Sequence, residues 1–335
     1  MTETLETFRA ALTDRYALER ELGRGGMATV HLGHDLRHDR PVALKVLHPE
    51  FAGTVGPERF PREIRLVARL QHPHIVTVLD SGEAAGRLWF TMPYVEGESL
   101  RDRLVREKQL PVPDAVRITA EAALALDYAH RHGVIHRDIK PENILLSDGQ
   151  ALVADFGIAQ TLTSSQEQLT QTGTTVGTPA YMSPEQAAGE HQLDAKTDIY
   201  SLATVLYEML SGELPFIGPT PQAINAKRLT AEPAPLRRVR PAVPASLDQA
   251  LRQALALLPA DRFSSAAEFA RAVTGSVSAG IALPSAAETA AAFAHEVPSW
   301  QRTTRRSTLH DPRSESACPH YRSVDPSAAI ERHIR

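Results

Sequence analysis

The pattern of apolar positions divides the chain into a β-prone first third and a mainly helical remainder. Residues 16–36 hold two β-prone segments around a glycine cluster, and residues 40–47 are rich in Val, Ala and Leu. Residues 58–71 carry apolar side chains at helical spacing, while 75–83 and 86–95 are typical of two further strands. This order predicts a small antiparallel sheet with one helix.

Helical patterns dominate from about residue 96 to residue 275. Long Ala- and Leu-rich segments end at Gly133 and Gly212, as expected of buried helices with glycine C-caps. Two further helices are expected in residues 246–263 and 265–275, and a short sheet beside the loop at 133–146. The sequence therefore predicts an α+β protein whose larger part is helical.

The two ends of the chain differ from this middle part. Residues 1–15 are expected to be an N-terminal extension, and residues 276–335, rich in Ala, Ser, Thr and Arg, a disordered tail. The least charged stretch, residues 272–287, is short and broken by Gly, Ser, Thr and Pro. A bilayer helix needs about 20 mostly apolar residues, so we expect no membrane span.

Charge and cysteine content narrow the functional classes. A formal charge of -4 argues against nucleic acid or an anionic membrane as the main partner. Cys318 is the single cysteine, which excludes an intrachain disulfide and fits a reducing compartment. We therefore expect a cytoplasmic protein.

Three motifs are ambiguous when each is taken alone. Glycines at 23, 25 and 26 either close a tight hairpin or let backbone N–H groups approach phosphate oxygens. Lys45, in an apolar strand, either extends to water or holds a buried anion, with Glu63 as an available partner. Asp155, at the end of another strand, either caps a turn or holds Mg²⁺.

The loop "GVIHRDIKPENILL" at 133–146 is more specific. Asp138 and Lys140, two residues apart on an extended loop, can point to the same side, as a general base and a cation that steadies a transferred group. Asn143 adds an oxygen ligand for a metal. A solvated turn does not explain this combination, which predicts a reaction centre.

These motifs together resemble a known family. "GRGGMATV", "VALK", "HRDIKPEN", "DFG" and "GTPAYMSPE" occur in the order of a eukaryotic-like (Hanks-type) serine/threonine protein kinase of the bacterial kind. The resemblance covers roughly residues 16–275. It implies two lobes, an N-lobe at 16–95 and a C-lobe at 96–275, in a transferase of bacterial signalling.

The resemblance also implies roles for individual residues. Asp138 is the expected catalytic base, Lys140 neutralises the γ-phosphate, and Lys45 holds the α- and β-phosphates while paired with Glu63. Asn143 and Asp155 would bind Mg²⁺. The expected ATP-binding residues are Leu22, Gly23, Arg24, Gly25, Gly26, Met27, Ala28, Thr29, Val30, Ala43, Lys45, Met92, Tyr94 and Val95.

Regulation is expected through the activation segment. Arg137, directly before the base, is predicted to receive a phosphate on Thr170 or Thr172. Two structural roles follow from the same resemblance, a buried ion pair between Glu185 and Arg262 and support of the catalytic loop by Asp198. Protein substrates are expected, with a transient homodimer for autophosphorylation.

One departure from the family pattern lies beside Glu63. Pro61 is tolerated in a first helical turn but costs about 3 kcal/mol in a helix interior. We therefore expect the helix to start near Phe60 or to be kinked, with a Lys45–Glu63 pair that is poised rather than permanent.

Two other functions are compatible with parts of this sequence. A pseudokinase scaffold is disfavoured because Lys45, Glu63, Asp138, Asn143 and Asp155 are all present. A small-molecule phosphotransferase of kinase fold is disfavoured by the threonine-rich segment before "SPE", which is typical of polypeptide docking. The sequence thus predicts a serine/threonine kinase that uses ATP and Mg²⁺.

Overall fold

The computed structural model describes residues 2–49, 59–156, 179–190 and 192–276. The predicted phosphorylation sites Thr170 and Thr172 lie outside the described residues, and so does the tail from residue 277 that was expected to be disordered. The described part is an antiparallel sheet with one helix on its inner side, followed by a mainly helical part with a second, small sheet. The predicted α+β fold class is therefore confirmed.

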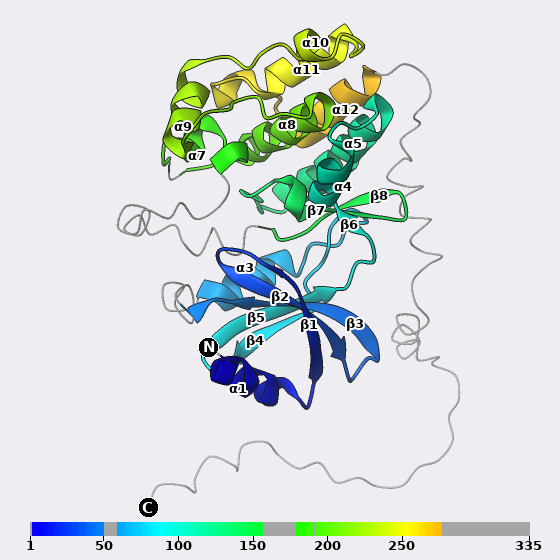
Figure 1. The fold of residues 1–335 in the computed structure, drawn as a ribbon, viewed down its shortest axis with the longest axis vertical. Helices are drawn as coiled ribbons and strands as arrows, with labels where there is room; N and C mark the ends of the chain where they lie inside the picture. Colours follow the sequence, from blue (N-terminus) through cyan, green and yellow to red (C-terminus); the bar gives the residue numbers. More distant parts are fainter. Residues whose placement is uncertain (1, 50–58, 157–178, 191, 277–335) are drawn as a thin grey trace, which may run out of the picture. The chain divides into compact units, whose positions relative to one another are not determined.

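The first sheet has five antiparallel strands in the order β1-β2-β3-β5-β4 (Figure 1). Their bounds are β1 Tyr16–Arg24, β2 Ala28–Asp35, β3 Arg40–Leu47, β4 Asp80–Ala84 and β5 Arg87–Pro93. β3 is central, pairing with β2 on one side and with β5 on the other. Both edges of β3 are therefore paired, and residues on both of its faces belong to buried clusters, which fits its almost continuous apolar sequence.

Alternate residues of β3 face two different clusters of buried side chains. Val42, Leu44 and Val46 pack with Phe8 of helix α1 (Thr2–Leu12), while Ala43 and Leu47 belong to the main core. Successive side chains of a strand point to opposite faces, so Lys45 lies on the face away from α1. One strand thus joins the sheet to α1 and places Lys45 on the opposite, inner face.

Helix α1 was not foreseen within the N-terminal extension. It contacts β1 and β4, and Phe8 is fully buried against Trp89, Tyr16 and the even-numbered residues of β3. Its buried residues Phe8 and Leu12 stand four positions apart, but a helix of 11 residues carries only a short apolar pattern. The extension is therefore part of the folded core.

The segment between helix α3 (Arg59–Val67) and β4 differs from the prediction of a strand starting at residue 75. Strand β4 begins only at Asp80, because Ile75 forms a parallel bridge with Val153 of the second sheet instead. Val76 N–H donates to Val153 O (2.9 Å), and Val153 N–H donates to His74 O (2.8 Å). This stretch consequently joins the two sheets rather than extending the first.

Pro61 is the third residue of the described part of α3. In a first turn the missing N–H of proline has no helical acceptor to lose, which makes the residue tolerable there. The expected helix start near Phe60 agrees with this boundary.

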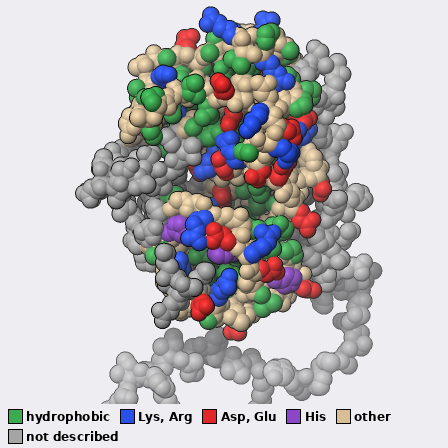
Figure 2. Space-filling model, viewed as in Figure 1, with side chains coloured by type: hydrophobic (Ala, Val, Ile, Leu, Met, Phe, Trp, Pro, Cys, Tyr) green, Lys and Arg blue, Asp and Glu red, His purple; other side chains and the backbone are tan. Residues whose placement is uncertain are grey.

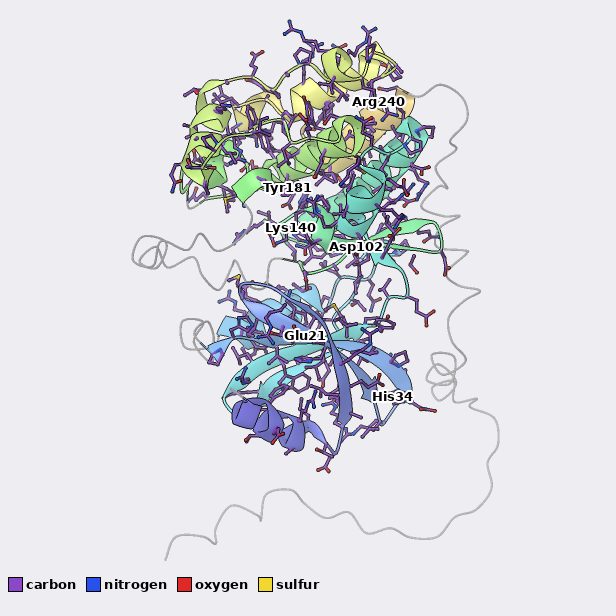
Figure 3. All side chains as sticks on the ribbon, viewed as in Figure 1. Glu21, His34, Asp102, Lys140, Tyr181 and Arg240 are labelled. Carbon is purple, nitrogen blue, oxygen red and sulfur yellow. The ribbon has the colours of Figure 1, made fainter. Side chains whose placement is uncertain are left out.

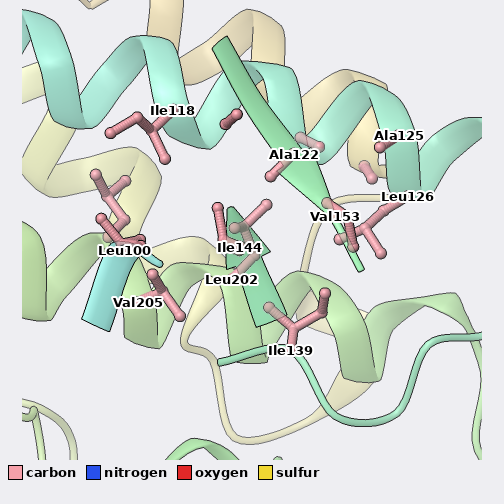
Figure 4. Packing of buried hydrophobic residues seen from close by; sticks show 14 of the residues in the cluster. Leu100, Ile118, Ala122, Ala125, Leu126, Ile139, Ile144, Val153, Leu202 and Val205 are labelled. Atoms are coloured by element: carbon pink, nitrogen blue, oxygen red, sulfur yellow. The ribbon is translucent and has the colours of Figure 1, made fainter. Parts of the chain in front are cut away.

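The helical part is built around α5 (Val112–Arg131) and α8 (Ala195–Ser211). Figure 4 shows Ile118, Ala122 and Leu126 of α5 packing near Leu202 of α8 and Ile139 of the predicted catalytic loop. The second sheet, β6-β7-β8, comprises β6 Glu98–Ser99, β7 Ile144–Ser147 and β8 Gln150–Val153. The remaining helices are α4 Leu100–Glu107, η1 Pro141–Asn143, η2 Pro179–Tyr181, α7 Pro184–Ala187, α9 Pro221–Thr230, α10 Leu236–Val239, α11 Ala245–Ala254, η3 Pro259–Asp261 and α12 Ala266–Gly275.

Basic and acidic side chains are interspersed over the described surface in Figure 2. On α4, for example, Arg103 pairs with Glu107 and Arg106 with Glu98. Among the helices that the structure describes, none is long and apolar enough to cross a membrane.

Truncation of Phe8 tests whether α1 belongs to the core. Because the ring is fully buried, Phe8→Ala should lower the free energy of unfolding by about 3–5 kcal/mol. Urea denaturation measures this change, with Glu6→Ala, at an exposed position of the same helix, as the matched control. Equal stability of the two variants would contradict the packing role of α1.

His72 makes the stability of the fold sensitive to mild acid. Burial, helped by the nearby charges of His74 and Arg131, lowers the pKa of His72 from 6.5 to about 4. The unfolded chain therefore binds the proton first, and stability falls as pH drops from about 6.5 towards 4. At pH 5 the loss from this residue should be about 2 kcal/mol.

His72→Asn, which keeps an acceptor for the backbone N–H of His74, should remove this part of the pH dependence. Urea denaturation at pH 7 and pH 5 measures the difference. His34→Asn, at a surface histidine paired with Asp39, is the control. An unchanged pH dependence in His72→Asn would show that another group is responsible.

Candidate active site

The loop at residues 133–146 is held from below by a buried carboxylate. Asp198, fully buried in the first turn of α8, accepts hydrogen bonds from the backbone N–H of His136 (2.8 Å) and of Arg137 (2.7 Å). His130 Nε2 donates to the same carboxylate at 2.7 Å. Arg137 has a φ of 66°, a strained backbone that these bonds hold in place. Asp198 thus supports the loop as predicted.

The charge of Asp198 is maintained by its donors. Burial alone raises the pKa of Asp198, but the hydrogen bond and charge of His130 and the backbone N–H of His136 hold the pKa below its usual value. The carboxylate therefore stays ionised at neutral pH and can accept hydrogen bonds from both N–H groups of the loop.

Three predicted site residues converge within this loop. Lys140 Nζ lies 2.7 Å from Asp138 Oδ2, and Asn143 Nδ2 donates to Asp138 O (2.7 Å) and more weakly to Asp138 Oδ2 (3.2 Å). Lys140 and Asn143 flank the η1 turn, and Figure 3 labels Lys140 on this loop. Both side-chain donors share Oδ2, so in the described part of the chain Oδ1 is the oxygen of Asp138 that has no protein donor.

Asp155 lies beside this group and pairs with Lys45. Lys45 Nζ is 2.7 Å from Asp155 Oδ2, and the backbone N–H of Ala154 donates to Asn143 O (2.9 Å). Burial by itself raises the pKa of Asp155. The charge and hydrogen bond of Lys45 act in the opposite direction, and the net shift is downward. Asp155 is accordingly an ionised carboxylate paired with a cationic side chain.

The chemistry of these oxygens fits a magnesium ion. Asp155 Oδ1 is buried and has no hydrogen-bond partner among the described residues, and Asn143 is adjacent to it through Ala154. Groups of three or more His, Cys, Asp or Glu that could hold a metal do not occur in the described ranges. Mg²⁺ typically uses only one or two carboxylates together with substrate phosphates, so the small ligand set suits it.

Glu63 does not complete the ion pair that the resemblance implies. Within the described residues Lys45 pairs with Asp155 and forms no ion pair with Glu63, which is half-buried on α3. The structure therefore has Lys45 in contact with the predicted metal ligand, and the described residues show no Lys45–Glu63 ion pair.

The glycine-rich turn connects β1 and β2. The backbone N–H of Gly25 donates to Ala28 O (2.9 Å), which closes the turn. A Cβ atom added at Gly23 or Gly26 would meet no atom within 4 Å, and neither residue has a positive φ. Neither packing nor backbone conformation requires glycine there, so the backbone of the turn is open to close approach from outside.

The predicted adenine contacts lie on one side of the first sheet. Ala43 and Met92 are paired neighbours on β3 and β5, both buried in the main core. Leu22, Val30 and Val95 are partly buried and pack against the same cluster, and Tyr94 follows β5. The structure thus brings the apolar members of the predicted ATP site together.

Arg137 reaches the segment that follows the undescribed residues 157–178. Gln186 Nε2 on α7 donates to Arg137 O at 2.8 Å. Glu185, next to it, forms the predicted buried pair with Arg262, with N–O distances of 2.7 and 2.8 Å. That pair is confirmed, whereas the predicted contact of Arg137 with Thr170 or Thr172 falls outside the described residues.

Sequence reasoning missed a second network beside the loop. Arg101 on α4 bonds Glu142 of η1 (3.0 Å), Glu208 of α8 (2.8 Å) and the hydroxyl of Tyr181. Figure 3 labels Tyr181. Burial raises the pKa of Tyr181, and Glu208 raises it further, so the phenol is a donor at neutral pH. No local motif marks these four residues, because they come from four separate elements.

The comparisons agree with this geometry. Residues 16–273 match the protein kinase domain family. The chain belongs to this family. Serine/threonine-protein kinase PknB of Mycolicibacterium smegmatis is 45% identical over 263 residues, and that of Mycobacterium tuberculosis is 44% identical over 263 residues. Both matches cover 77% of this chain and 42% of the relative.

A probable serine/threonine-protein kinase PknB of Bifidobacterium longum is 39% identical over 283 residues, covering 81% of this chain and 41% of the relative. The kinase domain therefore spans about two fifths of the length of these curated relatives. The predicted membership of the protein kinase family is confirmed, and the relatives reported above are bacterial proteins named as serine/threonine kinases.

Proposed function

We propose that this kinase domain transfers the γ-phosphoryl group of ATP to serine or threonine hydroxyls of proteins, its own activation segment included. The observation that supports the proposal best is the connected set of Lys45, Asp155, Asn143, Asp138 and Lys140. An N-lobe at residues 16–95 and a C-lobe at 96–275 would enclose the nucleotide between them.

Asp138 would act as the base. Its Oδ2 is shared by Lys140 and Asn143, which fixes the carboxylate and leaves Oδ1 to accept the proton of the substrate hydroxyl. Lys140, already beside this carboxylate, would neutralise charge on the transferred group. Side-chain positioning and electrostatics thus supply most of what phosphoryl transfer needs.

Asn143 and Asp155 would hold Mg²⁺, which neutralises phosphate charge when bound. Lys45 would exchange its contact with Asp155 for contacts with the nucleotide phosphates and Glu63. The glycine-rich residues Leu22, Gly23, Arg24, Gly25, Gly26, Met27, Ala28, Thr29 and Val30 would cover the phosphates, and Ala43, Met92, Tyr94 and Val95 would enclose the adenine.

Phosphorylation of Thr170 or Thr172 would be sensed by Arg137, whose guanidinium can bind a phosphate with two charge-assisted hydrogen bonds. Two copies would meet transiently for transfer between them. We place the reaction in the cytoplasm, because ATP is available there and the single cysteine suits a reducing compartment.

Replacement of Asp138 by Asn tests the reaction. The parent protein, incubated with labelled ATP, Mg²⁺ and a generic acceptor protein, should incorporate label at Ser or Thr, and Asp138→Asn should lower the rate by about 100-fold or more. Peptide mapping locates the label, and incorporation at Thr170 or Thr172 would support control through Arg137.

Asp148→Asn is the matched control, since Asp148 occupies a turn with a φ of 48° that asparagine also adopts. ATP binding without label transfer by the parent would contradict the kinase proposal and favour a binding scaffold.

Pro61→Arg tests whether the start of α3 limits formation of the Lys45–Glu63 pair. Proline disfavours helical backbone at the residue before it and prevents the helix from continuing through it, and arginine removes both restrictions. The basal rate should therefore rise about fivefold, equivalent to about 1 kcal/mol. Initial rates of label transfer to the acceptor protein measure this. Pro113→Arg, in the first turn of α5, is the control; unchanged or lower activity of Pro61→Arg would count against the idea.

A further inference from the structure

His48, the first residue after β3, contacts the glycine-rich turn at three points. Its backbone N–H donates to Met27 O (2.9 Å), which continues the β2–β3 pairing by one residue. Its ring Nδ1 lies 3.2 Å from Gly26 O, and its ring Nε2 lies 3.0 Å from the hydroxyl of Thr29. One residue therefore spans the turn from its tip to the start of β2.

The partners determine how the ring is protonated. The Gly26 carbonyl can only accept, so Nδ1 carries the hydrogen. In the neutral ring Nε2 then accepts, and the hydroxyl of Thr29, which is buried, donates to it. The neutral imidazole thus satisfies both neighbours in a single arrangement.

These bonds set the direction of the backbone amides. Carbonyl and N–H of a trans peptide point in opposite directions. The Gly26 and Met27 carbonyls are turned towards His48, so the N–H groups of Met27 and Ala28 point away from it. Backbone N–H groups are the donors by which glycine-rich turns bind phosphate.

The turn has few other constraints. Gly25 and Gly26 are exposed, and added side chains at Gly23 and Gly26 would meet nothing. Strand pairing holds the two sides of the turn at Arg24–Thr29 and Ala28–Leu47. Between them, the described contacts at the tip are the Gly25–Ala28 bond, the backbone-to-backbone bond from His48 and its two ring contacts.

We propose that His48 is a positioning residue that holds the glycine-rich turn in the conformation that receives the phosphates of ATP. The inference rests on the proposed kinase function and adds to it a residue that touches the turn rather than the nucleotide.

His48→Leu tests this assignment, because it keeps the backbone bond and bulk but removes both ring contacts. The KM for ATP should rise about tenfold, the effect of two lost hydrogen bonds of ordinary strength, with kcat changed less than about threefold. The affinity for adenosine, which has no phosphates, should stay unchanged. Calorimetry with ATP and with adenosine, both with Mg²⁺, gives the ratio of the two affinities.

Two further variants separate the ring contacts. His48→Asn keeps a donor near the position of Nδ1 and should recover part of the ATP affinity, whereas Thr29→Val removes only the second contact and should fall between parent and His48→Leu. His34→Leu, at a histidine of β2 that pairs with Asp39 (Figure 3), is the control and should leave the ratio unchanged.

Loss of ATP and adenosine affinity in equal proportion, or an unchanged ratio in His48→Leu, would overturn the assignment. If His48→Leu fails to fold, Thr29→Val and His48→Asn test the assignment of His48 instead. A parent-like ratio of ATP to adenosine affinity in both variants would overturn the assignment. Failure of the parent protein to bind ATP would instead contradict the proposed kinase function.

Discussion

The site depends on one buried carboxylate. Asp198 receives two adjacent backbone N–H groups from the loop and a ring N–H from His130, all within 2.8 Å. A buried charge is stable only when its hydrogen bonds are satisfied, so the loop cannot relax without leaving that charge exposed to an apolar core. The strained conformation of Arg137, and with it the placement of Asp138 and Lys140, follows from this requirement.

Asp155 is a second carboxylate that positions a side chain of the site, and its partner is Lys45. The ammonium group of Lys45 contacts Asp155 in this structure. The proposed exchange of Asp155 for Glu63 would move one unit of positive charge from the loop of Asp155 towards α3. Such an exchange would link the position of α3 to the release of the Asp155 carboxylate from its ion pair.

Most of the site could be predicted because its residues lie in short, dense motifs. Asp138, Lys140 and Asn143 fall within six residues of one loop, and the resemblance supplied Asp198 and the Glu185–Arg262 pair. The bonds of Arg101 join residues 41, 107 and 80 positions away, and sequence spacing holds no signal for such contacts. Helix α1 escaped prediction although Phe8 and Leu12 stand at helical spacing, because so short a helix is stabilised by packing on the sheet rather than by its own sequence.

The link between Val153 and the stretch from His74 to Val76 consists of main-chain hydrogen bonds, only two residues before Asp155. Side-chain substitutions do not remove such bonds, and only proline eliminates the donor. The register that leads into Asp155 therefore does not depend on which side chains stand at these positions. The side chains of Ile75, Val76 and Val153 are buried in the main core, so packing rather than hydrogen bonding limits substitution at the join between the two sheets.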